Sequence, residues 1–550
     1  MAEEGVIFVR KATGLVREVG VLGSMSLPIC YAVGAGINLF TAQAIGKYPH
    51  TNVTLAIIIG GIPIVCLAIA MGLMTICMPR TGGMYLFISR TINPVVAMLG
   101  TWGYIWSCLM AYGIVCYVCA VFWGFGFFLV GTATGNAALL AIGSTLSKPI
   151  YSLALGLAIA IFWWIVTLTG MTYMSKILNV FMLIPLIASL LGISYMFAAA
   201  ANPHSLMTAW DNVFGAGAWD AILTVASNHG WSPTSPEYGM YPMEWTATWY
   251  TSIVAVWAYA GIEAASFIGS EVKSPSRTMI FGGVIAPIFV MVLYTLMGFS
   301  LVSAYGPFVS AYEFIAGITP GSPGPDVLWP EVRALCPTYP DSPPLASLPL
   351  FQSVYAAGLG HTASAAAIAF ATALWLFNGP PAFMVAASRV IFAGAFDRLF
   401  PEKLAAVNDR FHSPHWAITL SAIVGIAYTI MNYFGHWPVI VASEPMMVIG
   451  YLIASIAAML FPFVRQDVWE RGRKLTIGPI PVITLLGAIA TPFFLYQTFL
   501  SIAALSKGLT GMVFYTGFYF LMALIITISY AYNVRRGINV RLIYSEIPPA

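Results

Sequence analysis

The chain alternates long apolar stretches with short polar ones along nearly all of its length. A helix that crosses the hydrocarbon core of a bilayer needs about 20 mostly apolar residues. Twelve stretches satisfy that length, and we predict that each forms a spanning helix: 21–46, 53–78, 94–130, 149–170, 176–200, 247–271, 278–305, 354–386, 416–436, 439–464, 479–504 and 510–533. The third and eighth are longer than a bilayer requires, so we expect strong tilt or an extramembrane end.

The composition agrees with an all-α integral membrane protein. Of the 550 residues, 59% are hydrophobic and only 8% are charged, whereas a soluble globular chain carries about 25% charged residues. An apolar side chain that faces acyl tails needs no burial by protein, so lipid is the expected environment. The net charge is +3 and the chain has no basic cluster that would follow phosphates, so a nucleic-acid partner is not expected.

The distribution of Lys and Arg tests the number of spans independently. With the amino terminus in the cytoplasm, four of the 23 Lys and Arg residues lie in outside segments: Lys47, Lys148, Arg333 and Lys507. The other 19 lie in cytoplasmic segments, which is the bias that the positive-inside rule describes. We therefore predict a multi-pass protein of the cell membrane with both termini in the cytoplasm.

Two predicted outside loops are long, at about 201–246 and 306–353, and are rich in Pro, Gly, Trp and Tyr. They are too polar to span a bilayer. Either they cap the outer face or they are tolerated insertions, and we favour the second interpretation. No other stretch is long enough to form a soluble catalytic domain.

Two predicted spans contain glycines where an interruption of the helix is favourable. The first span holds the run from Gly34 to Asn38, and the sixth holds the run from Trp257 to Ser266 with Gly261 near its centre. Transporters place substrates where helices are interrupted near the middle of the membrane. The interruption frees main-chain N–H and C=O groups that hydrocarbon cannot satisfy. For the first run taken alone, close packing through small residues is the favoured alternative.

Glu263 is the only acidic residue deep within a predicted span. An intramembrane carboxylate costs several kcal/mol unless it is neutral, paired or hydrated. We interpret Glu263 as a proton-coupling candidate, because an isolated carboxyl at this depth is favoured in its neutral form and can exchange a proton with one side. A purely structural hydrogen bond from the protonated acid is the alternative.

The two glycine runs lie five spans apart, which suggests an inverted repeat. Five spans that start at each run form two copies, and an odd number of spans inverts the second copy in the membrane. Two additional helices then follow at the carboxyl end. We therefore divide the chain into a cytoplasmic segment, a ten-helix core, helices eleven and twelve, and a cytoplasmic tail: 1–20, 21–465, 466–534 and 535–550.

Ordered motifs over about 20–465 resemble the amino acid–polyamine–organocation (APC) transporters. Gly34-Ala35-Gly36-Ile37 is similar to the Gly-x-Gly-Ile of that family's first helix. The other matching stretches are the segments 79–85, 259–263 with 271–277, and Ser388-Arg389 with 397–401 and Pro414. The resemblance implies a five-plus-five inverted repeat with discontinuous helices 1 and 6.

The resemblance also implies where an amino acid binds. The substrate carboxylate is expected at free N–H groups near the start of the second half of helix 1, and the ammonium at carbonyls of helix 6. Helix ends explain this, since free N–H groups attract anions and free carbonyls attract cations. The expected substrate-binding residues are Ala35, Gly36, Ile37, Asn38, Trp257, Ala258, Tyr259, Ala260 and Gly261.

Two departures from the family pattern bear on the substrate and on the coupling ion. Asn38 stands where an apolar or aromatic residue is usual, which adds a side chain able to hydrogen-bond substrate. Pro185 stands where some proton-coupled members carry lysine, so a lysine mechanism is not expected. Together with Gly261-x-Glu263, the Ile184-Pro185 pattern is similar to the arginine/agmatine antiporter branch. H⁺ and Na⁺ both stay open as coupling ions.

Four aromatic residues are predicted to enclose the substrate: Trp106, Trp257, Tyr259 and Phe383. An aromatic face attracts an ammonium or guanidinium by about 0.5–2 kcal/mol per contact. Ordinary packing is the alternative, because aromatics make up 14% of the chain.

Other polar residues carry weaker hypotheses. Asn378, before Gly379-Pro380-Pro381, marks a helix kink or part of an ion site, and we favour the kink. His361 either titrates near neutral pH or is an interfacial side chain, and we favour the second. Arg80, Arg389 and Asp397 either form ion pairs that open and close with the inner gate or only set the topology.

These observations predict a secondary active transporter for amino acids or related amines, working by alternating access. Carriers for another organic cation or a polyamine are the runner-up, and a channel would need polar rings along a pore. No His, Asp or Glu cluster has metal-ligand spacing, and no GxxxxGK[ST] loop for ATP is present. We therefore expect no metal, no cofactor and no enzymatic activity.

Overall fold

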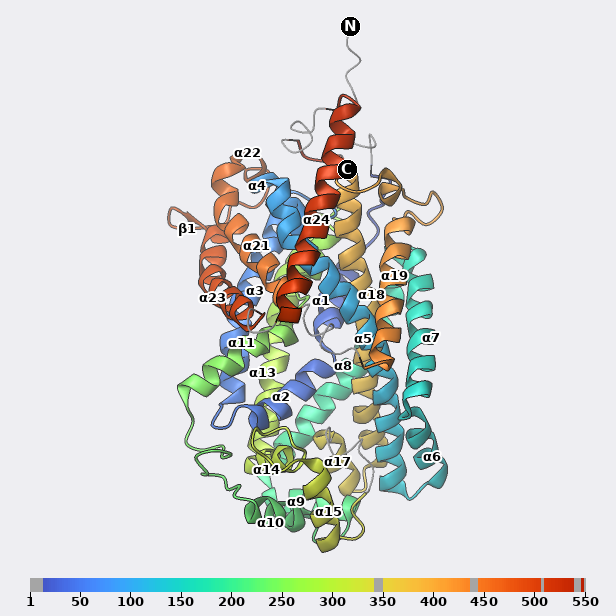
Figure 1. The fold of residues 1–550 in the computed structure, drawn as a ribbon, viewed down its shortest axis with the longest axis vertical. Helices are drawn as coiled ribbons and strands as arrows, with labels where there is room; N and C mark the ends of the chain where they lie inside the picture. The colour runs from blue at the N-terminus through green and yellow to red at the C-terminus, as the bar shows by residue number, and fades with distance from the viewer. Residues whose placement is uncertain (1–12, 341–349, 436–443, 506–508, 539–545, 549–550) are drawn as a thin grey trace.

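The computed structural model describes residues 13–340, 350–435, 444–505, 509–538 and 546–548. Within them the chain is an elongated bundle of α-helices with a single two-stranded hairpin (Figure 1). Among these described residues, ten helical segments are long and apolar enough to cross a membrane. They are α3 (Val53–Cys77), α5 (Pro94–Thr134), α7 (Pro149–Leu168), α8 (Met171–Ala201), α12 to α13 (Pro275–Ile280 and Ala286–Tyr305, joined by the π-helical η2, Phe281–Ile285), α18 (Thr362–Phe396), α19 (His415–Tyr433), α21 (Glu444–Val464), α23 (Val482–Leu505) and α24 (Leu509–Arg535). The protein is thus a multi-pass, all-α membrane protein.

The third and eighth spans are as long as their sequence predicts, with 41 residues in α5 and 35 in α18. The start of α5 matches the prediction, because Asn93 caps it by accepting a 2.7 Å hydrogen bond from the Val95 N–H. The predicted start of the eighth span is wrong. Residues 351–358 form a separate helix, α17 (Phe351–Gly358), and α18 begins only after a turn through Gly360, whose φ is +78°.

The first and sixth predicted spans are both discontinuous, as the sequence predicts. The first is divided into α1 (Val21–Ala32) and α2 (Ala35–Lys47), which meet at Val33 and Gly34. In the sixth, α11 (Trp245–Tyr259) gives way to a turn and then to the 3₁₀-helix η1 (Ala264–Phe267). Helices α1 and η1 pack against each other, and both contact α18. The two interruptions therefore lie side by side inside the bundle.

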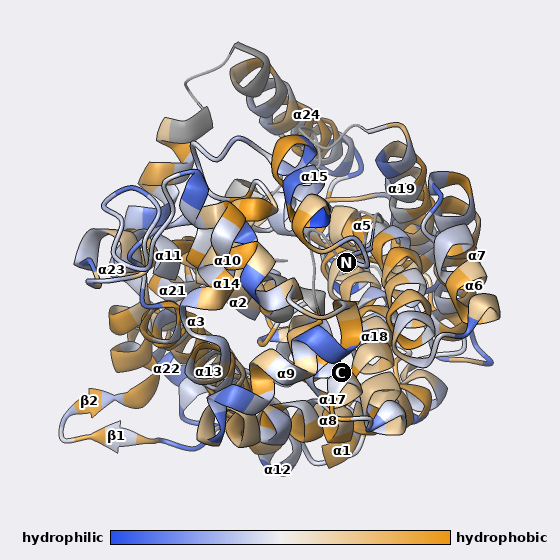
Figure 2. Cartoon of the chain, turned by 90° about the horizontal axis from the view of Figure 1, so that it is seen from below, coloured by the Kyte–Doolittle hydropathy of each residue, from blue (hydrophilic) through white to orange (hydrophobic). Residues whose placement is uncertain are grey.

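The two long loops fold into helices that close one end of the bundle, which we call the loop cap (Figure 1). It consists of α9 (Pro203–Phe214), α10 (Ala218–Asn228), α14 (Pro307–Ile315), α15 (Pro325–Leu335) and α17. Its interior is aromatic: the Trp219 ring stacks on Phe308 at 3.6 Å, and Trp210 packs against Phe308 at 4.9 Å. Seen from this end, α9, α10 and α15 show hydrophilic patches (Figure 2). This arrangement favours capping, the interpretation that the sequence placed second, over mere insertion.

The described parts of both chain ends lie at the opposite end of the bundle (Figure 1). The N–H groups of Glu18 and Val19 each donate to the Glu271 carbonyl at 2.9 Å. The Arg80 Nε donates to the Pro548 carbonyl at 2.6 Å. The remaining elements are α4 (Gly83–Thr91), α6 (Ala137–Leu146), η3 (Glu402–Ala405), α22 (Gln466–Trp469), β1 (Thr476–Ile477) and β2 (Ile480–Pro481). Both ends thus lie on one side, and that this side is the cytoplasm stays a prediction.

Candidate functional site

The two helix interruptions touch through Tyr31 and Gly261. Gly261 has a φ of +92°, a conformation that glycine adopts without strain. A Cβ atom built on Gly261 would lie 1.5 Å from Cδ1 of Tyr31, in the last turn of α1. The Tyr31 ring also meets Phe383 of α18 edge-on, with ring centroids 4.4 Å apart. Glycine at 261 therefore ends α11 and also leaves room for the first helix to approach.

Tyr294 of α13 joins the main chains of the two interrupted helices. Its hydroxyl lies 2.6 Å from the Ala32 carbonyl, at the end of α1, and 3.0 Å from the Ala258 carbonyl, near the end of α11. A phenol has one proton to donate, so the two carbonyls share it. The ring is fully buried and packs against Tyr259 at 5.0 Å. Tyr294 thus fixes the ends of both helices relative to each other.

Glu263 lies at the centre of a cluster of hydroxyl groups. Its Oε1 accepts a 2.8 Å hydrogen bond from the Tyr104 hydroxyl of α5 and a 3.1 Å bond from the Tyr451 hydroxyl of α21. The residue is 2% exposed, and its Oε2 has no partner among the described residues. Next to it, the Tyr31 hydroxyl and the Cys108 Sγ are 3.0 Å apart. One carboxyl oxygen is thus satisfied, whereas the other is buried without a donor among the described residues.

Main-chain groups at the two interruptions are the candidate substrate ligands. Helix α2 begins at Ala35 and its cap residue Gly34 offers no side-chain acceptor to the first N–H groups, which are unpaired at any helix start. At the other interruption the Trp257 carbonyl accepts from the Ala260 N–H, and the Tyr259 carbonyl from Ile262. Among the described residues, no donor reaches the Ala260 carbonyl.

The predicted binding residues of the first helix are described only in part. Ile37 is fully buried, and its carbonyl accepts a 2.6 Å hydrogen bond from the Thr41 hydroxyl. The main chain of Ala35, Gly36 and Asn38 belongs to the start of α2, but their side-chain surroundings lie outside the described part of the structure.

The aromatic residues predicted to enclose a substrate are placed differently from one another. The Trp257 side chain is 47% exposed, whereas Tyr259 is buried and donates to the Ile57 carbonyl of α3 at 3.1 Å. Phe383 lies beside Tyr31, as described above. Trp106 packs instead with Phe518 of α24, at 5.5 Å between ring centroids.

The position of Trp106 follows from helical geometry. Tyr104 and Cys108 are four residues apart, so they share the face of α5 that points to Glu263 and Tyr31. A residue two positions after Tyr104 is rotated by about 200° around the helix. Trp106 therefore faces the opposite way, toward Tyr428 of α19 and toward α24.

Asn378 completes a hydrogen bond that a proline leaves open. Pro185, inside α8, has no N–H to donate to the carbonyl four residues earlier, which is that of Phe181. The Asn378 Nδ2 of α18 lies 2.5 Å from this carbonyl and donates to it. Helix α18 continues through Pro380 and Pro381. This contact explains Asn378 as a link between two proline-containing helices, although its Oδ1 has no partner among the described residues.

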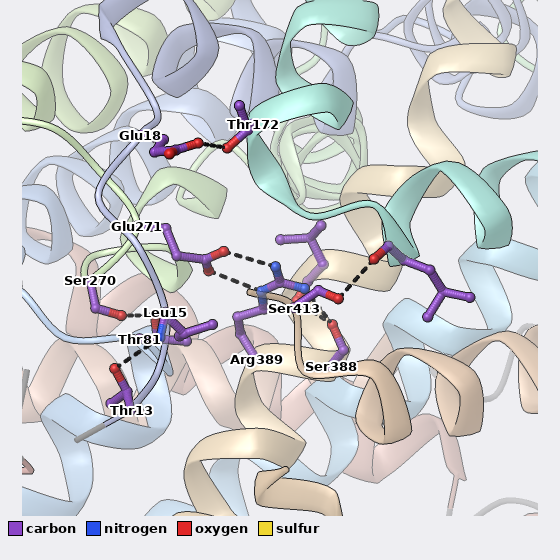
Figure 3. Close-up of polar contacts among 12 residues, drawn as sticks. Thr13, Leu15, Glu18, Thr81, Thr172, Ser270, Glu271, Ser388, Arg389 and Ser413 are labelled. Carbon is purple, nitrogen blue, oxygen red and sulfur yellow. Dashed lines mark hydrogen bonds and ion pairs between the residues drawn. The ribbon is translucent and has the colours of Figure 1, made fainter. Parts of the chain in front are cut away.

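Two buried ion pairs hold the end of the bundle that carries the termini. The Arg389 guanidinium of α18 binds Glu271 with both arms, at 3.1 and 3.0 Å (Figure 3). Arg90 of α4 binds Asp397 in the same way, at 2.5 and 2.8 Å. All four side chains are at most 3% exposed. The expected ion pairs of Arg389 and Asp397 thus exist, whereas Arg80 donates to main-chain carbonyls.

The Arg389–Glu271 pair ties three segments of the chain together. Glu271 is the last residue of the sixth predicted span and binds Arg389 of the eighth (Figure 3). The Glu271 carbonyl also accepts from the N–H groups of residues 18 and 19. Ser270 and Thr81 are hydrogen-bonded to each other beside it (Figure 3). Separation of α1 from the sixth and eighth spans on this side would break these contacts.

Reasoning from sequence missed the hydroxyl groups around the site, namely Tyr31, Tyr104, Tyr294 and Tyr451. The i, i+4 spacing of Tyr104 and Cys108 in an apolar helix was the one local signal. The partners Glu271 and Arg90 were missed for a different reason, since each binds a residue far away in the chain, at separations of 118 and 307 residues. His361 is exposed and its Nδ1 lies 2.8 Å from the Tyr195 hydroxyl, at the end of the bundle that carries the loop cap.

Comparison with known families covers nearly the whole chain. A family model described as amino acid permease matches residues 19–528. This range includes both interrupted helices, Glu263 with its tyrosines, and both buried ion pairs. A search of curated proteins found no match.

Proposed function

The chain belongs to the amino acid permease family, and from this premise we propose that it carries its substrate between the two interrupted helices while Glu263 exchanges a proton. Family membership implies transport of amino acids across a membrane. The substrate, the coupling ion and the choice between symport and exchange belong to the proposal. So does the orientation, with both termini in the cytoplasm and the loop cap outside.

One observation supports the proposal: unpaired main-chain groups of opposite polarity belong to the two helix interruptions, which touch through Tyr31 and Gly261. The uncapped start of α2 offers N–H groups to a carboxylate. The end of α11 offers the Ala260 carbonyl to an ammonium. A zwitterionic amino acid has both charges in one molecule, so it satisfies both sets at once. We keep the half-exposed Trp257 as the aromatic residue that covers the substrate.

Glu263 supports proton coupling through its unequal oxygens. Oε1 accepts from two tyrosines, whereas Oε2 is buried without a partner. An ionised carboxylate with an unpaired buried oxygen is costly, so loss of the proton requires access to water or to a new donor. Movement of α1 or α21 would provide that access, because the cluster is built from both helices. The conformational cycle and the proton are therefore linked at one residue.

The coupling role is tested by Glu263→Gln in proteoliposomes, measured as amino acid uptake across a range of pH. We expect the glutamine variant to lose the pH dependence while it still exchanges substrate. Glu244→Gln, an exposed carboxyl just before α11, is the matched control and should behave as the unmodified protein. An unchanged pH profile in Glu263→Gln would remove Glu263 from the coupling role.

The substrate class is tested by thermal stabilisation of the purified protein across a panel of amino acids, agmatine and polyamines. A ligand that binds the native state raises its melting temperature, and the rise grows with the ratio of ligand concentration to dissociation constant. We expect stabilisation by amino acids, reduced in Trp257→Ala. Stabilisation by polyamines alone would favour the carrier for organic cations instead. The arginine/agmatine branch stays a prediction until that panel is measured.

A further inference from the structure

Glu313 is an acidic residue at the joint between the loop cap and the interrupted first helix. It lies in α14, which packs against α2. The side chain is fully buried. A Cβ atom built on Gly46 of α2 would lie 2.5 Å from the Glu313 Cβ, so the main chain of Gly46 packs directly on the Glu313 side chain. The joint is therefore closed directly over a carboxyl group.

The Glu313 carboxyl has no partner in this joint. Neither of its oxygens makes a hydrogen bond or ion pair with any described residue. The hydroxyl of Thr319, which follows on the same loop and also lies next to Gly46, is likewise buried without a partner. Burial raises the pKa of Glu313 from 4.5 to about 8. A buried carboxylate with no compensating charge is unfavourable, so the closed joint favours the neutral acid.

No charged group on the surrounding elements replaces the missing partner. Besides Tyr294, which binds the carbonyls of the two interrupted helices, the ionisable residues on these elements are Lys47 of α2, Asp220 of α10, Tyr305 at the end of α13, and Asp326, Glu331 and Arg333 of α15, together with Tyr312 of α14 itself. Lys47, Asp220 and Asp326 are exposed, and Glu331 binds His229. Tyr305 donates to the Phe351 carbonyl. The Tyr312 hydroxyl is neutral near pH 7, because burial raises its pKa well above the usual value.

We propose that Glu313 is a proton-binding site, distinct from Glu263, which takes up a proton from the medium on the cap side whenever α14 closes onto α2. The ligand is a single proton, and the site is the carboxyl between Gly46 and Thr319. When the joint separates, water reaches the carboxyl and the proton leaves as the group ionises. Closure of the cap thus depends on the pH of that medium.

The sign of this dependence follows from the two pKa values. In the separated joint the carboxyl titrates near its ordinary 4.5, and in the closed joint near 8. Between these values the closed form holds one proton more, so closure is favoured at low pH and loses this support as the pH rises through 8. Within the window, each pH unit changes the ratio of closed to separated joints by up to about tenfold.

This site depends on the proposed function only for its effect on transport. If the loop cap faces outside, as we propose above, an acidic exterior closes the cap and loads a proton before the substrate moves inward. The joint itself needs no titration of Glu263 and no substrate. The test therefore measures the joint without measuring transport.

The test uses Thr319→Cys in the full-length protein in proteoliposomes, labelled with a membrane-impermeant maleimide between pH 6 and 8. At each pH, this labelling rate is divided by the rate for the same cysteine in the Glu313→Gln variant. The division removes the pH dependence that comes from ionisation of the thiol itself. We expect this ratio to rise several-fold per pH unit, up to about tenfold. Addition of Glu244→Gln or Glu263→Gln should leave the rise of this labelling ratio with pH unchanged. A failure of the proposed role of Glu263 is therefore distinguishable from a failure of the Glu313 proposal.

A ratio that stays constant from pH 6 to 8 would overturn the proposal. Since Thr319→Cys alters the joint itself, amide hydrogen exchange of residues 307–319 provides a second measurement without a cysteine. Exchange in the unmodified protein, divided by exchange in Glu313→Gln at each pH, should rise over the same window. A hydrogen-exchange ratio that stays constant from pH 6 to 8 would likewise overturn the proposal.

Discussion

Substitution of Gly261 by alanine tests the contact on which the site depends. A non-glycine residue at a φ of +92° costs about 1–2 kcal/mol. The new Cβ would also fall 1.5 Å from the Tyr31 ring, and relief of such overpacking costs typically about 1–3 kcal/mol. We therefore expect Gly261→Ala to lower the free energy of unfolding by about 2–5 kcal/mol, measured by titration of the detergent-solubilised protein with SDS.

Two variants separate strain from collision. Gly478, between β1 and β2, has a φ of +59° and no heavy atom near its built Cβ, so Gly478→Ala measures the backbone term alone. Tyr31→Ala removes the ring, and in that background Gly261→Ala should cost only about 1–2 kcal/mol. If Gly261→Ala costs the same with and without the Tyr31 ring, the two interrupted helices do not meet in the way described.

Three further substitutions test other contacts by the same titration. Arg389→Met should lower the free energy of unfolding by about 3–5 kcal/mol because it leaves Glu271 charged and buried. The double variant Arg389→Met with Glu271→Met should recover much of this stability. If the losses of the two single variants simply add in the double variant, the pairing is contradicted. Asn378→Ala should lower the free energy of unfolding by about 1–3 kcal/mol, because the Phe181 carbonyl loses its donor. Pro185→Ala restores an N–H that can bond this carbonyl, so Asn378→Ala should cost less in that background. Equal losses with Pro185 and with Ala at 185 would count against the contact between α8 and α18. Tyr294→Phe should lower the free energy of unfolding by about 1–3 kcal/mol, because the carbonyls of Ala32 and Ala258 lose their hydroxyl donor. A change under about 0.5 kcal/mol would show that other groups donate to these carbonyls.

Local rules predicted much of the fold. Apolar length located the helices, since hydrocarbon tolerates only helices that satisfy their own main chain. The start of α5 followed from Asn93 and Pro94, and the interruption after Tyr259 followed from a glycine next to a buried acid. Where a local rule was incomplete the prediction failed, as at Gly360, where a turn separates α17 from α18 inside a continuous apolar stretch.

For the candidate site, the sequence predicted the main-chain groups but not the side chains that surround them. The glycine runs indicated where N–H and C=O groups become free. They carried no information on which side chains from other helices approach. Trp106 illustrates this, because a place in the correct span did not put it on the correct face of α5. The loop cap is another example, since its polar composition gave no sign that Trp210, Trp219 and Phe308 would form a core.

By itself the sequence determined the membrane class, the approximate positions of the spanning helices and the two points where they are interrupted. These features depend on apolar length and on backbone freedom, which residues close together in the chain decide. Only the tertiary structure decided that Tyr104 and Tyr451, which are 159 and 188 residues from Glu263, share its Oε1. It also decided that Arg389 pairs with Glu271 and that Glu313 is sealed against Gly46. The physical reason is that hydrogen bonds and burial depend on distance in space, which the packing of the whole bundle sets.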